Sequence, residues 1–169
     1  RLADRADVLF ENIRPDVKHR LGIDYETLSA RNPRLVYVSI SGFGQDGPWA
    51  ARPAFDEVIQ ASSGFASAMG SDDEPAFVPS LVADKICGLT IVGAVSAALV
   101  HRERTGKGQM VEVPMLETIT AFNSIEMLGG HAFDPPIGPT GYKRMKERRP
   151  VRTRDGWLTM LPYSGDNWC

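Results

Sequence analysis

The stretch from residue 79 to residue 109 constrains the fold of this chain more than any other part of the sequence. From Ile86 to Val100 no side chain is charged, and glycine, alanine and serine recur among the apolar residues, a pattern typical of a closely packed helix. Charged residues begin at His101, and Gly106 can take the left-handed conformation in which helices often end. We therefore expect a helix that is buried inside the protein and ends near residue 104.

Asp84 is the one acidic residue where this apolar helix begins. An aspartate at such a place is most often an N-cap, whose carboxylate accepts hydrogen bonds from backbone N–H groups that have no partner within the helix. The same surroundings would keep the carboxylate ionised, as a nucleophile or a general base requires. The helical pattern alone leaves both roles open for Asp84.

Composition places the chain among ordinary globular proteins. Its 169 residues suffice for one domain with a hydrophobic core, and 43% of them are hydrophobic, 24% are charged and the formal net charge is −2. Nothing in this balance indicates nucleic acid as a partner. The uncharged run from Ile86 to Val100 is shorter than the roughly 20 residues that a membrane-spanning helix needs, so we expect no membrane segment.

The cysteines and the first residue add two expectations. Cys87 and Cys169 form no CxxC pair and give no disulfide framework, which suits a reducing cytoplasm. The chain begins with Arg1 and not with methionine, and it stops just after an apolar segment. We expect a cytoplasmic protein of which this chain is a fragment.

Two runs rich in β-branched and aromatic residues, ADVLFE at 6–11 and LVYVSIS at 35–41, predict buried strands. Because Arg14-Pro15 cannot continue a ladder, we expect a loop at 12–17, at the carboxyl end of the first strand, where open α/β sheets bind ligands. The other expected elements are helices at 16–22, 24–30, 55–69 and 116–128 and a strand at 109–115. Their order predicts an α/β domain.

Two details sharpen these expectations. Asp24, with Thr27 three residues later, resembles the cap of the helix at 24–30. Pro114 cannot donate to a ladder, so its strand should lie at a sheet edge or end there.

The second strand is followed by SGFGQDGP at residues 41–48, which reads literally as GxGxxG. We reject a dinucleotide site, because that motif must open a helix whose N-terminus meets the pyrophosphate, whereas Pro48 and Pro53 interrupt the backbone. The alternative is a long glycine-rich loop over a site, with Trp49 and Phe55 as its anchors.

The composition changes after residue 128. Residues 129–150 are rich in proline and predict a linker, and residues 143–154 hold seven cations against one acid. Such a run can bind phosphates, but a solvated surface is the simpler interpretation. Asp155-Gly156 predicts a turn before a strand at 157–162. We expect a first domain at 1–128, a linker at 129–150 and the start of a second domain at 151–169.

Three ordered blocks resemble one known family: ADVLFENIRPDVKHRLGID, NPRLVYVSISGFGQDGPWAARPAFDEVIQASSG and ADKICGLTIVGAVSAALVHRERTGKGQMVEVPM. They are similar to the class III CoA-transferase or CaiB/BaiF family, which includes formyl-CoA and carnitine CoA-transferases and 2-methylacyl-CoA racemases. The resemblance runs from about Ala6 to Trp168. It implies part of a Rossmann-like large domain, then the start of a small α+β domain, in a protein that forms an interlocked homodimer.

The resemblance also implies site residues. The family's nucleophilic aspartate corresponds to Asp84, which would attack an acyl-CoA thioester and pass through an aspartyl anhydride and an aspartyl-CoA thioester. Coenzyme A is then a substrate, and neither a permanently bound cofactor nor a metal is implied. The family's CoA contacts correspond to Asn12, Ile13 and Arg20, and Arg14 stands where some relatives also have a cation. From the sequence alone, Arg14 and Arg20 are ordinary surface residues.

Two other functions stay open. The racemase branch has a His-Asp pair where this chain has Phe55 and Asp56, and a two-base proton exchange without that histidine loses one base. A transferase is therefore favoured over a racemase or isomerase, with Phe55 as a candidate substrate contact. No His/Cys/Asp cluster has metal-ligand spacing. The alternative from another class is a non-catalytic CoA-binding module.

Overall fold

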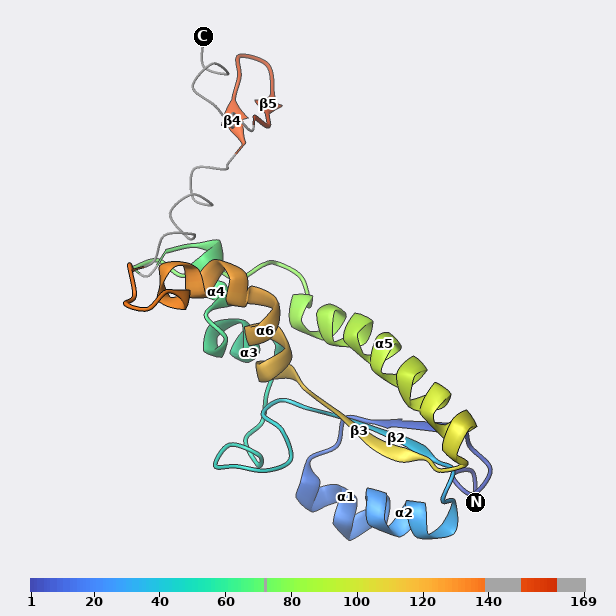
Figure 1. Ribbon diagram of the computed structural model, residues 1–169. Helices are drawn as coiled ribbons and strands as arrows, with labels where there is room; N and C mark the ends of the chain where they lie inside the picture. Colours follow the sequence, from blue (N-terminus) through green and yellow to red (C-terminus); the bar gives the residue numbers. More distant parts are fainter. Residues whose placement is uncertain (72, 139–149, 161–169) are drawn as a thin grey trace. The chain divides into compact units, whose positions relative to one another are not determined.

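The computed structural model describes residues 1–71, 73–138 and 150–160. Contacts divide the chain into two compact units, Arg1–Asn123 and Ser124–Cys169. The first contains a parallel sheet flanked by helices, and the second contains a short hairpin (Figure 1). The expected α/β fold is therefore confirmed for the first unit.

Three parallel strands form the sheet of the first unit: β1 (Val8–Glu11), β2 (Val36–Ser41) and β3 (Gln109–Pro114). β2 lies in the middle, and the register pairs Val36 with Val8 on one side and with Gln109 on the other. β3 lies at an edge of the described sheet and ends at Pro114, as its sequence predicts. The three strands match the predicted runs to within two residues at each end.

The described residues form six α-helices: α1 (Pro15–Leu21), α2 (Tyr25–Arg31), α3 (Asp56–Ser62), α4 (Phe65–Met69), α5 (Val82–Thr105) and α6 (Met115–Leu128). Side chains of β2 alternate between two cores, as a strand requires. Val36 and Val38 pack in the core that contains α5, and Tyr37 packs with Leu28 of α2. Helices α1 and α2 therefore cover one face of the sheet and α5 covers the other (Figure 1).

Two predicted boundaries are wrong for local reasons. The loop expected at 12–17 ends early, because Pro15 occupies the first position of α1, where its missing N–H costs nothing. The single helix expected at 55–69 is divided into α3 and α4, because Gly64 has a φ of 77°. Asp24 does cap α2, as predicted.

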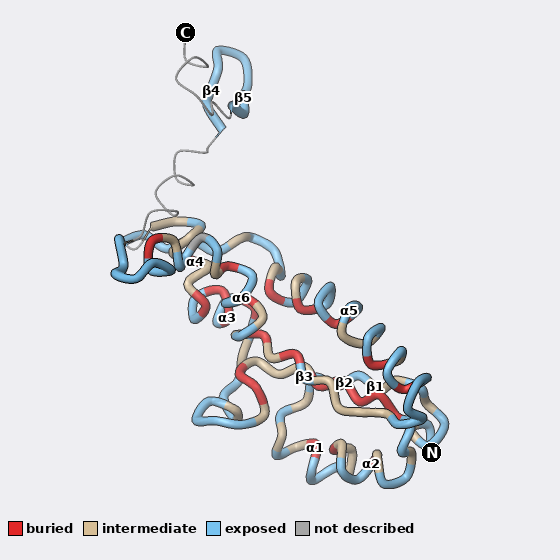
Figure 2. The backbone as a smooth tube through the Cα atoms, in the orientation of Figure 1, coloured by how far each residue is buried: buried red, intermediate tan, exposed pale blue. Residues whose placement is uncertain are grey.

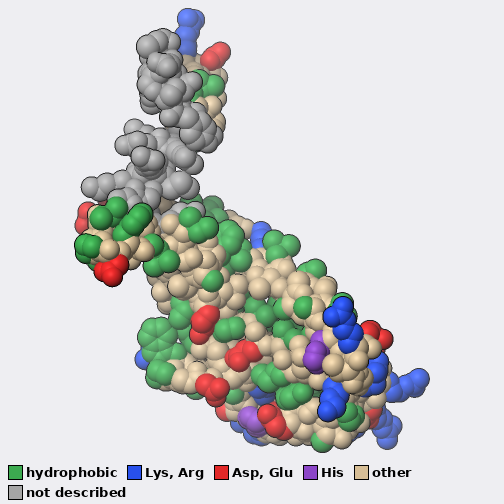
Figure 3. All heavy atoms as spheres, in the orientation of Figure 1, with side chains coloured by type: hydrophobic (Ala, Val, Ile, Leu, Met, Phe, Trp, Pro, Cys, Tyr) green, Lys and Arg blue, Asp and Glu red, His purple; other side chains and the backbone are tan. Residues whose placement is uncertain are grey.

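The expectation that the long apolar helix is buried is wrong for one of its sides. Ala83, Cys87 and Ile91 are buried against the sheet, but Leu89 and Val92 are 76% and 65% exposed. Hydrophobic side chains reach the surface along α5, whose turns are buried on one side only (Figures 2 and 3). An uncharged sequence does not encode which of its sides will be covered.

Among the described residues, α5 is also the one helix long and apolar enough to cross a membrane, judged by length and composition alone. This corrects the expectation that no apolar segment reaches that length, because the helix continues beyond the uncharged core at both ends. The core helix of a soluble protein passes the same test, so the finding is weak on its own. The helix ends at Thr105, and Gly106 is left-handed with a φ of 74°, as predicted.

The second unit contains a 3-10 turn, η1 (Gly129–Ala132), and the antiparallel strands β4 (Val151–Arg152) and β5 (Trp157–Leu158). Asp155-Gly156 lies in the turn between these strands, as predicted. The strand expected at 157–162 is described only to residue 160, and β5 covers its first two residues. Most of the basic run at 143–154 lies outside the described residues, and the division into domains at 128 and 150 stays a prediction.

Candidate active site

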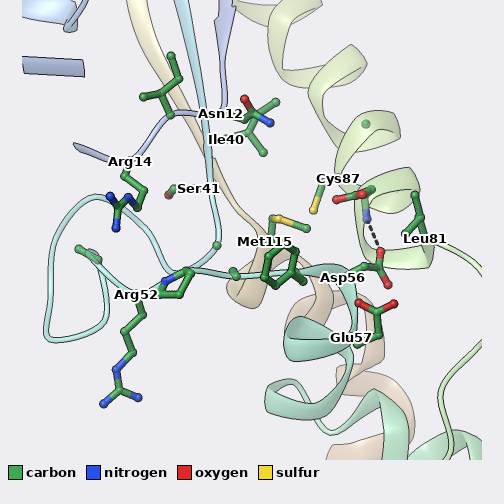
Figure 4. A pocket seen from close by; sticks show the side chains of 18 of the residues that line it. Asn12, Arg14, Ile40, Ser41, Arg52, Asp56, Glu57, Leu81, Cys87 and Met115 are labelled. Carbon is green, nitrogen blue, oxygen red and sulfur yellow. Dashed lines mark hydrogen bonds between the residues drawn. The ribbon is translucent and has the colours of Figure 1, made fainter. Parts of the chain in front are cut away.

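A cavity of about 650 Å³ opens at the carboxyl end of the sheet in the first unit (Figure 4). Its walls come from the ends of β1 and β2, the loop that follows β2, and the N-terminal turns of α3 and α5. The lining segments are residues 12–15, 40–42, 50 and 52–57, together with Leu81, Asp84, Cys87, Gly88, Ile91 and Met115. Parallel α/β sheets place ligands at this edge.

Five of the six residues singled out from the sequence line this one cavity: Asn12, Ile13, Arg14, Phe55 and Asp84. Arg20 does not. It is exposed in the last turn of α1, and five steps along the helix carry it about 7.5 Å along the axis from Pro15.

Asp84 is not the N-cap of α5, so the predicted capping role is wrong. Leu81 occupies the N-cap position without a side-chain hydrogen bond, and Asp84 is the third residue of the helix. The cap is supplied instead from α3, because the Asp84 backbone N–H donates to Asp56 Oδ1 at 3.0 Å (Figure 4, dashed line). A buried carboxylate on one helix thus serves the N-terminus of another.

Gln60 holds Asp56 in this position. Its Nε2 donates to Asp56 Oδ2 at 2.6 Å, and its Oε1 accepts from the Val78 N–H at 2.9 Å. Gln60 is buried, and with Asp56 it fixes both the entry to α5 and the first turn of that helix. The sequence carries a signal for this pair, since residues four apart on a helix meet, but their partner lies 28 positions away from Asp56.

The electrostatics of Asp84 also differ from the expectation of a carboxylate stabilised by amides. Loss of hydration raises the pKa of Asp84 above its usual value, and the nearby carboxylates of Asp56 and Glu57 raise it further. Although its side chain is exposed to the cavity, the anion is less stabilised there than in water. An anion of this kind is a more reactive nucleophile or base.

Cys87 lies one turn after Asp84 and lines the same cavity. Burial raises the pKa of its thiol to about 11, with the charges of Asp84 and Asp56 as smaller causes. The reactive form of cysteine is the thiolate, so near neutral pH Cys87 offers only a neutral thiol.

The glycine-rich loop forms the wall of the cavity between β2 and α3. A side chain at Gly42 would collide with Ala54, so glycine lets the two ends of the loop meet. Trp49 anchors the loop as predicted, with its ring 5.4 Å from that of the buried Phe43. Phe55, the second expected anchor, is 71% exposed and holds nothing in place. The next helix begins only at Asp56, so the glycines do not open a helix.

The described residues contain one group that could hold a metal ion, formed by His19, Asp24 and Glu26. Its possible ligand atoms lie within 4.8 Å of one another. None of the three residues lines the cavity, and both Asp24 oxygens accept hydrogen bonds from Thr27. This group is therefore separate from the candidate active site.

A parallel sheet with a carboxylate-bearing cavity at its carboxyl edge defines an α/β protein with a candidate small-molecule site. A family model described as CoA-transferase family III matches residues 1–169. The chain belongs to CoA-transferase family III.

Relatives with assigned activities support this membership. The chain is 37% identical over 166 residues to a succinate–glutarate CoA-transferase of Agrobacterium fabrum, covering 95% of this chain and 41% of the relative. It is 47% identical over 120 residues to an acetyl-CoA:oxalate CoA-transferase of Acetobacter aceti, covering 70% of this chain and 31% of the relative.

Solved structures show the same fold. The crystal structure of Rv3272 from Mycobacterium tuberculosis matches with a TM-score of 0.79 and 31% identity, over 99% of this chain and 44% of that chain. A CaiB/BaiF family protein from Brucella suis matches with a TM-score of 0.78 and 32% identity, over 92% of this chain and 42% of that chain. The chain spans less than half the length of the relatives it matches.

Proposed function

We propose that the protein containing this chain is a CoA-transferase that moves CoA between an acyl-CoA and a free carboxylic acid, with Asp84 as the nucleophile. The observation that carries the proposal is the position of Asp84. Its backbone is fixed by Asp56, its carboxylate faces a cavity large enough for an acyl group, and neighbouring acids destabilise its charge. Family membership supplies the reaction class.

In the proposed reaction the Asp84 carboxylate attacks the thioester carbonyl, the C–S bond breaks and CoA leaves as a thiolate. The product is a mixed anhydride. The thiolate then attacks the aspartyl carbonyl, which releases the first acid as a carboxylate and leaves an aspartyl-CoA thioester. A second carboxylate attacks this thioester and expels the thiolate, which finally attacks the new acyl group and frees Asp84.

Each step exchanges one activated acyl group for another, so the sequence needs no outside energy source. Asp56 and Gln60 would hold Asp84 in place while its carboxylate forms first the anhydride and then the CoA thioester. The neutral thiol of Cys87 would not compete with Asp84. Because Asp84 is exposed in the described residues, bound substrate or the rest of the protein must keep water from the intermediates.

The opposite wall of the cavity is proposed to bind CoA. Asn12 and Ile13 line it beside Arg14, whose guanidinium pairs with Asp16 only at 3.9 Å. An arginine at the carboxyl end of a strand can bind a phosphate through charge-assisted hydrogen bonds. Arg20, outside the cavity, stays in the proposal as a contact for the part of CoA that extends beyond it. Phe55 would offer its exposed ring to the acyl group.

The proposal includes a homodimer in the cytoplasm. The exposed apolar side of α5, with Leu89 and Val92, supports it, since a second chain or the remaining protein would remove these side chains from water. Light scattering on the full-length protein tests this: a mass of two chains supports the dimer, and a mass of one chain contradicts it.

Mass spectrometry of the full-length protein tests the nucleophile. We would incubate it with acetyl-, succinyl- and oxalyl-CoA, trap with hydroxylamine or borohydride, and digest. A modification at Asp84 supports the transferase. Unmodified peptides together with α-proton exchange into deuterated water would favour the racemase. Tight CoA binding with neither result would favour a non-catalytic binding module.

A further inference from the structure

The described structure contains a second carboxylate system, which does not line the cavity itself but lies next in the chain to residues that do, Asn12 after β1 and Ile40 in β2. Glu11, the last residue of β1, pairs with Lys18 of α1 at 3.0 Å, and both side chains are only 3% exposed. Lys18 also donates to Ser39 Oγ of β2 at 3.1 Å. We propose that this buried pair positions the two loops that receive acyl-CoA, which makes Lys18 and Glu11 positioning residues; the inference rests on the proposed function.

The first loop is held through Glu11. While Oε1 accepts from Lys18, Oε2 accepts the backbone N–H of Ile13 at 2.7 Å. Ile13 is the middle of the three residues, Asn12 to Arg14, that the cavity takes from the end of β1. The direction in which this turn leaves the strand is therefore set by a carboxylate whose own position depends on Lys18.

The second loop is held through Ser39. Its hydroxyl donates to Glu11 Oε1 and accepts from Nε2 of Gln45 in the glycine-rich loop. The Gln45 backbone N–H donates in turn to Glu112 Oε1 of β3 at 2.6 Å. One ion pair thus connects the turn after β1 with the loop after β2, the two segments that form the wall facing α5.

Stability alone does not account for this arrangement. Two charges removed from water lose hydration that their attraction repays only in part, so an apolar pair of similar volume would hold the fold about as well. An apolar pair could not accept the Ile13 N–H or orient the Ser39 hydroxyl, however. The charges supply a fixed geometry for both loops, and geometry is what a preformed substrate site needs.

The consequence for kinetics is specific. Loosening this wall should weaken acyl-CoA binding without changing the attack by Asp84, because Asp84 is held separately by Asp56. In a ping-pong reaction the KM for acyl-CoA should rise, while the KM for the acid and kcat stay near their parental values. If the pair had a purely structural role, its loss would lower thermal stability without raising the KM for acyl-CoA selectively.

The test uses the full-length protein with Lys18→Met, the double variant Glu11→Met/Lys18→Met, and Gln45→Ala. Lys18→Met leaves a carboxylate buried without its partner, so the double variant, which removes both charges, guards against simple unfolding. Gln45→Ala breaks only the connection to the second loop. We expect the first two to weaken CoA binding in calorimetric titration about ten- to hundredfold, and Gln45→Ala less.

Arg102→Met is the matched control. Arg102 is 8% exposed and pairs with Asp7 at 2.9 Å, but Asp7 precedes β1 at the opposite end of the strand and neither residue lines the cavity. It should lower the melting temperature and leave CoA affinity unchanged. The inference is overturned if the double variant and Gln45→Ala keep parental CoA affinity, or if Arg102→Met weakens CoA binding as much as they do.

The two proposals fail in different ways. If Asp84 is never modified but the Lys18 and Gln45 variants weaken CoA binding, the transferase proposal fails and the positioning inference stands. If Asp84 is modified in the parent protein and these variants bind CoA like the parent, the positioning inference fails and the transferase proposal stands.

Discussion

The helices α2 and α5 each have an aspartate at their N-terminus, but the two aspartates occupy different positions and different electrostatic environments. Asp24 precedes α2, and its Oδ1 accepts the Thr27 N–H at 2.9 Å while Oδ2 accepts the Thr27 hydroxyl at 3.0 Å. Asp84 lies inside the first turn of α5, where Asp56 of another helix has taken the capping role. One carboxylate is used by its own helix, and the other is left facing a cavity.

The pKa shifts of the two aspartates have opposite signs. The Thr27 backbone hydrogen bond is the main cause that lowers the pKa of Asp24, whereas loss of hydration and the charges of Asp56 and Glu57 raise that of Asp84. The carboxylate that caps its own helix is stabilised as an anion, and the one that faces the cavity is not. Because perturbed carboxylates cluster at functional sites, the difference supports Asp84, and not Asp24, as the residue for the proposed reaction.

Replacement of the free aspartate should give the largest effect. In the full-length protein, Asp84→Asn removes the proposed nucleophile and should reduce CoA transfer by at least about a thousandfold. It also removes repulsion from Asp56 and Glu57, so the melting temperature should stay the same or rise. Steady-state transfer and thermal unfolding measure the two effects. Residual transfer above a tenth of the parental rate would exclude Asp84 as the nucleophile.

Breaking the cap between α3 and α5 should have the next largest effect. Asp56→Ala removes the acceptor for the Asp84 N–H and one acceptor for Gln60 Nε2, so the proposed nucleophile would shift and transfer should fall about ten- to hundredfold. The melting temperature should fall as well, in contrast with Asp84→Asn. Asp73→Ala, in the exposed loop before α5, is the control and should change neither quantity. Parental transfer by Asp56→Ala would show that the cap does not position Asp84.

Opposite pH dependences should separate the two aspartates further. Asp24, with a lowered pKa, contributes stability above its usual pKa that is lost as the pH falls through its pKa in the folded state. Asp84 has a raised pKa, so its contribution to the free energy of unfolding is fully present below its usual pKa, where it is protonated. That contribution is lost as the pH rises through its pKa in the folded state.

Asn variants at both positions test these signs through thermal unfolding between about pH 3 and pH 8. Asp84→Asn should exceed the parent in stability at neutral pH, and Asp24→Asn should fall below it. Both differences should shrink in acid. A neutral-pH difference of the same sign for the two variants would contradict the comparison.

The sequence predicted the local part of this arrangement and not the tertiary part. Asp24 and Thr27 are three positions apart, so the cap of α2 can be recognised from the chain itself. The cap of α5 joins residues 28 positions apart, and no periodicity brings Asp56 to Asp84. The cap preference for aspartate therefore gave the same prediction for both helices and was correct for one.

The same distinction holds elsewhere in the fold. The β-branched and aromatic run at 35–41 predicted β2 as a buried strand, because the pattern of a strand lies within the strand. The uncharged run of α5 predicted a helix but not its exposed side, because burial depends on what packs against it. The pair of Glu11 and Lys18 was missed, since two charged residues in a short segment give no sign that both will be buried.

The smallest effect should come from the aspartate that serves only its helix. Asp24→Ala removes the acceptor for the Thr27 N–H, and the loss of such a cap costs about 1 kcal/mol of stability. Neither Asp24 nor its hydrogen-bond partner Thr27 lines the cavity, so CoA transfer below the melting temperature should stay parental. Asp24→Ser provides the control, because serine can accept the same hydrogen bond and should restore most of the lost stability. If Asp24→Ala reduced transfer as strongly as Asp84→Asn, the two helix N-termini would not differ in function, and the environment of Asp84 would no longer distinguish it as the nucleophile.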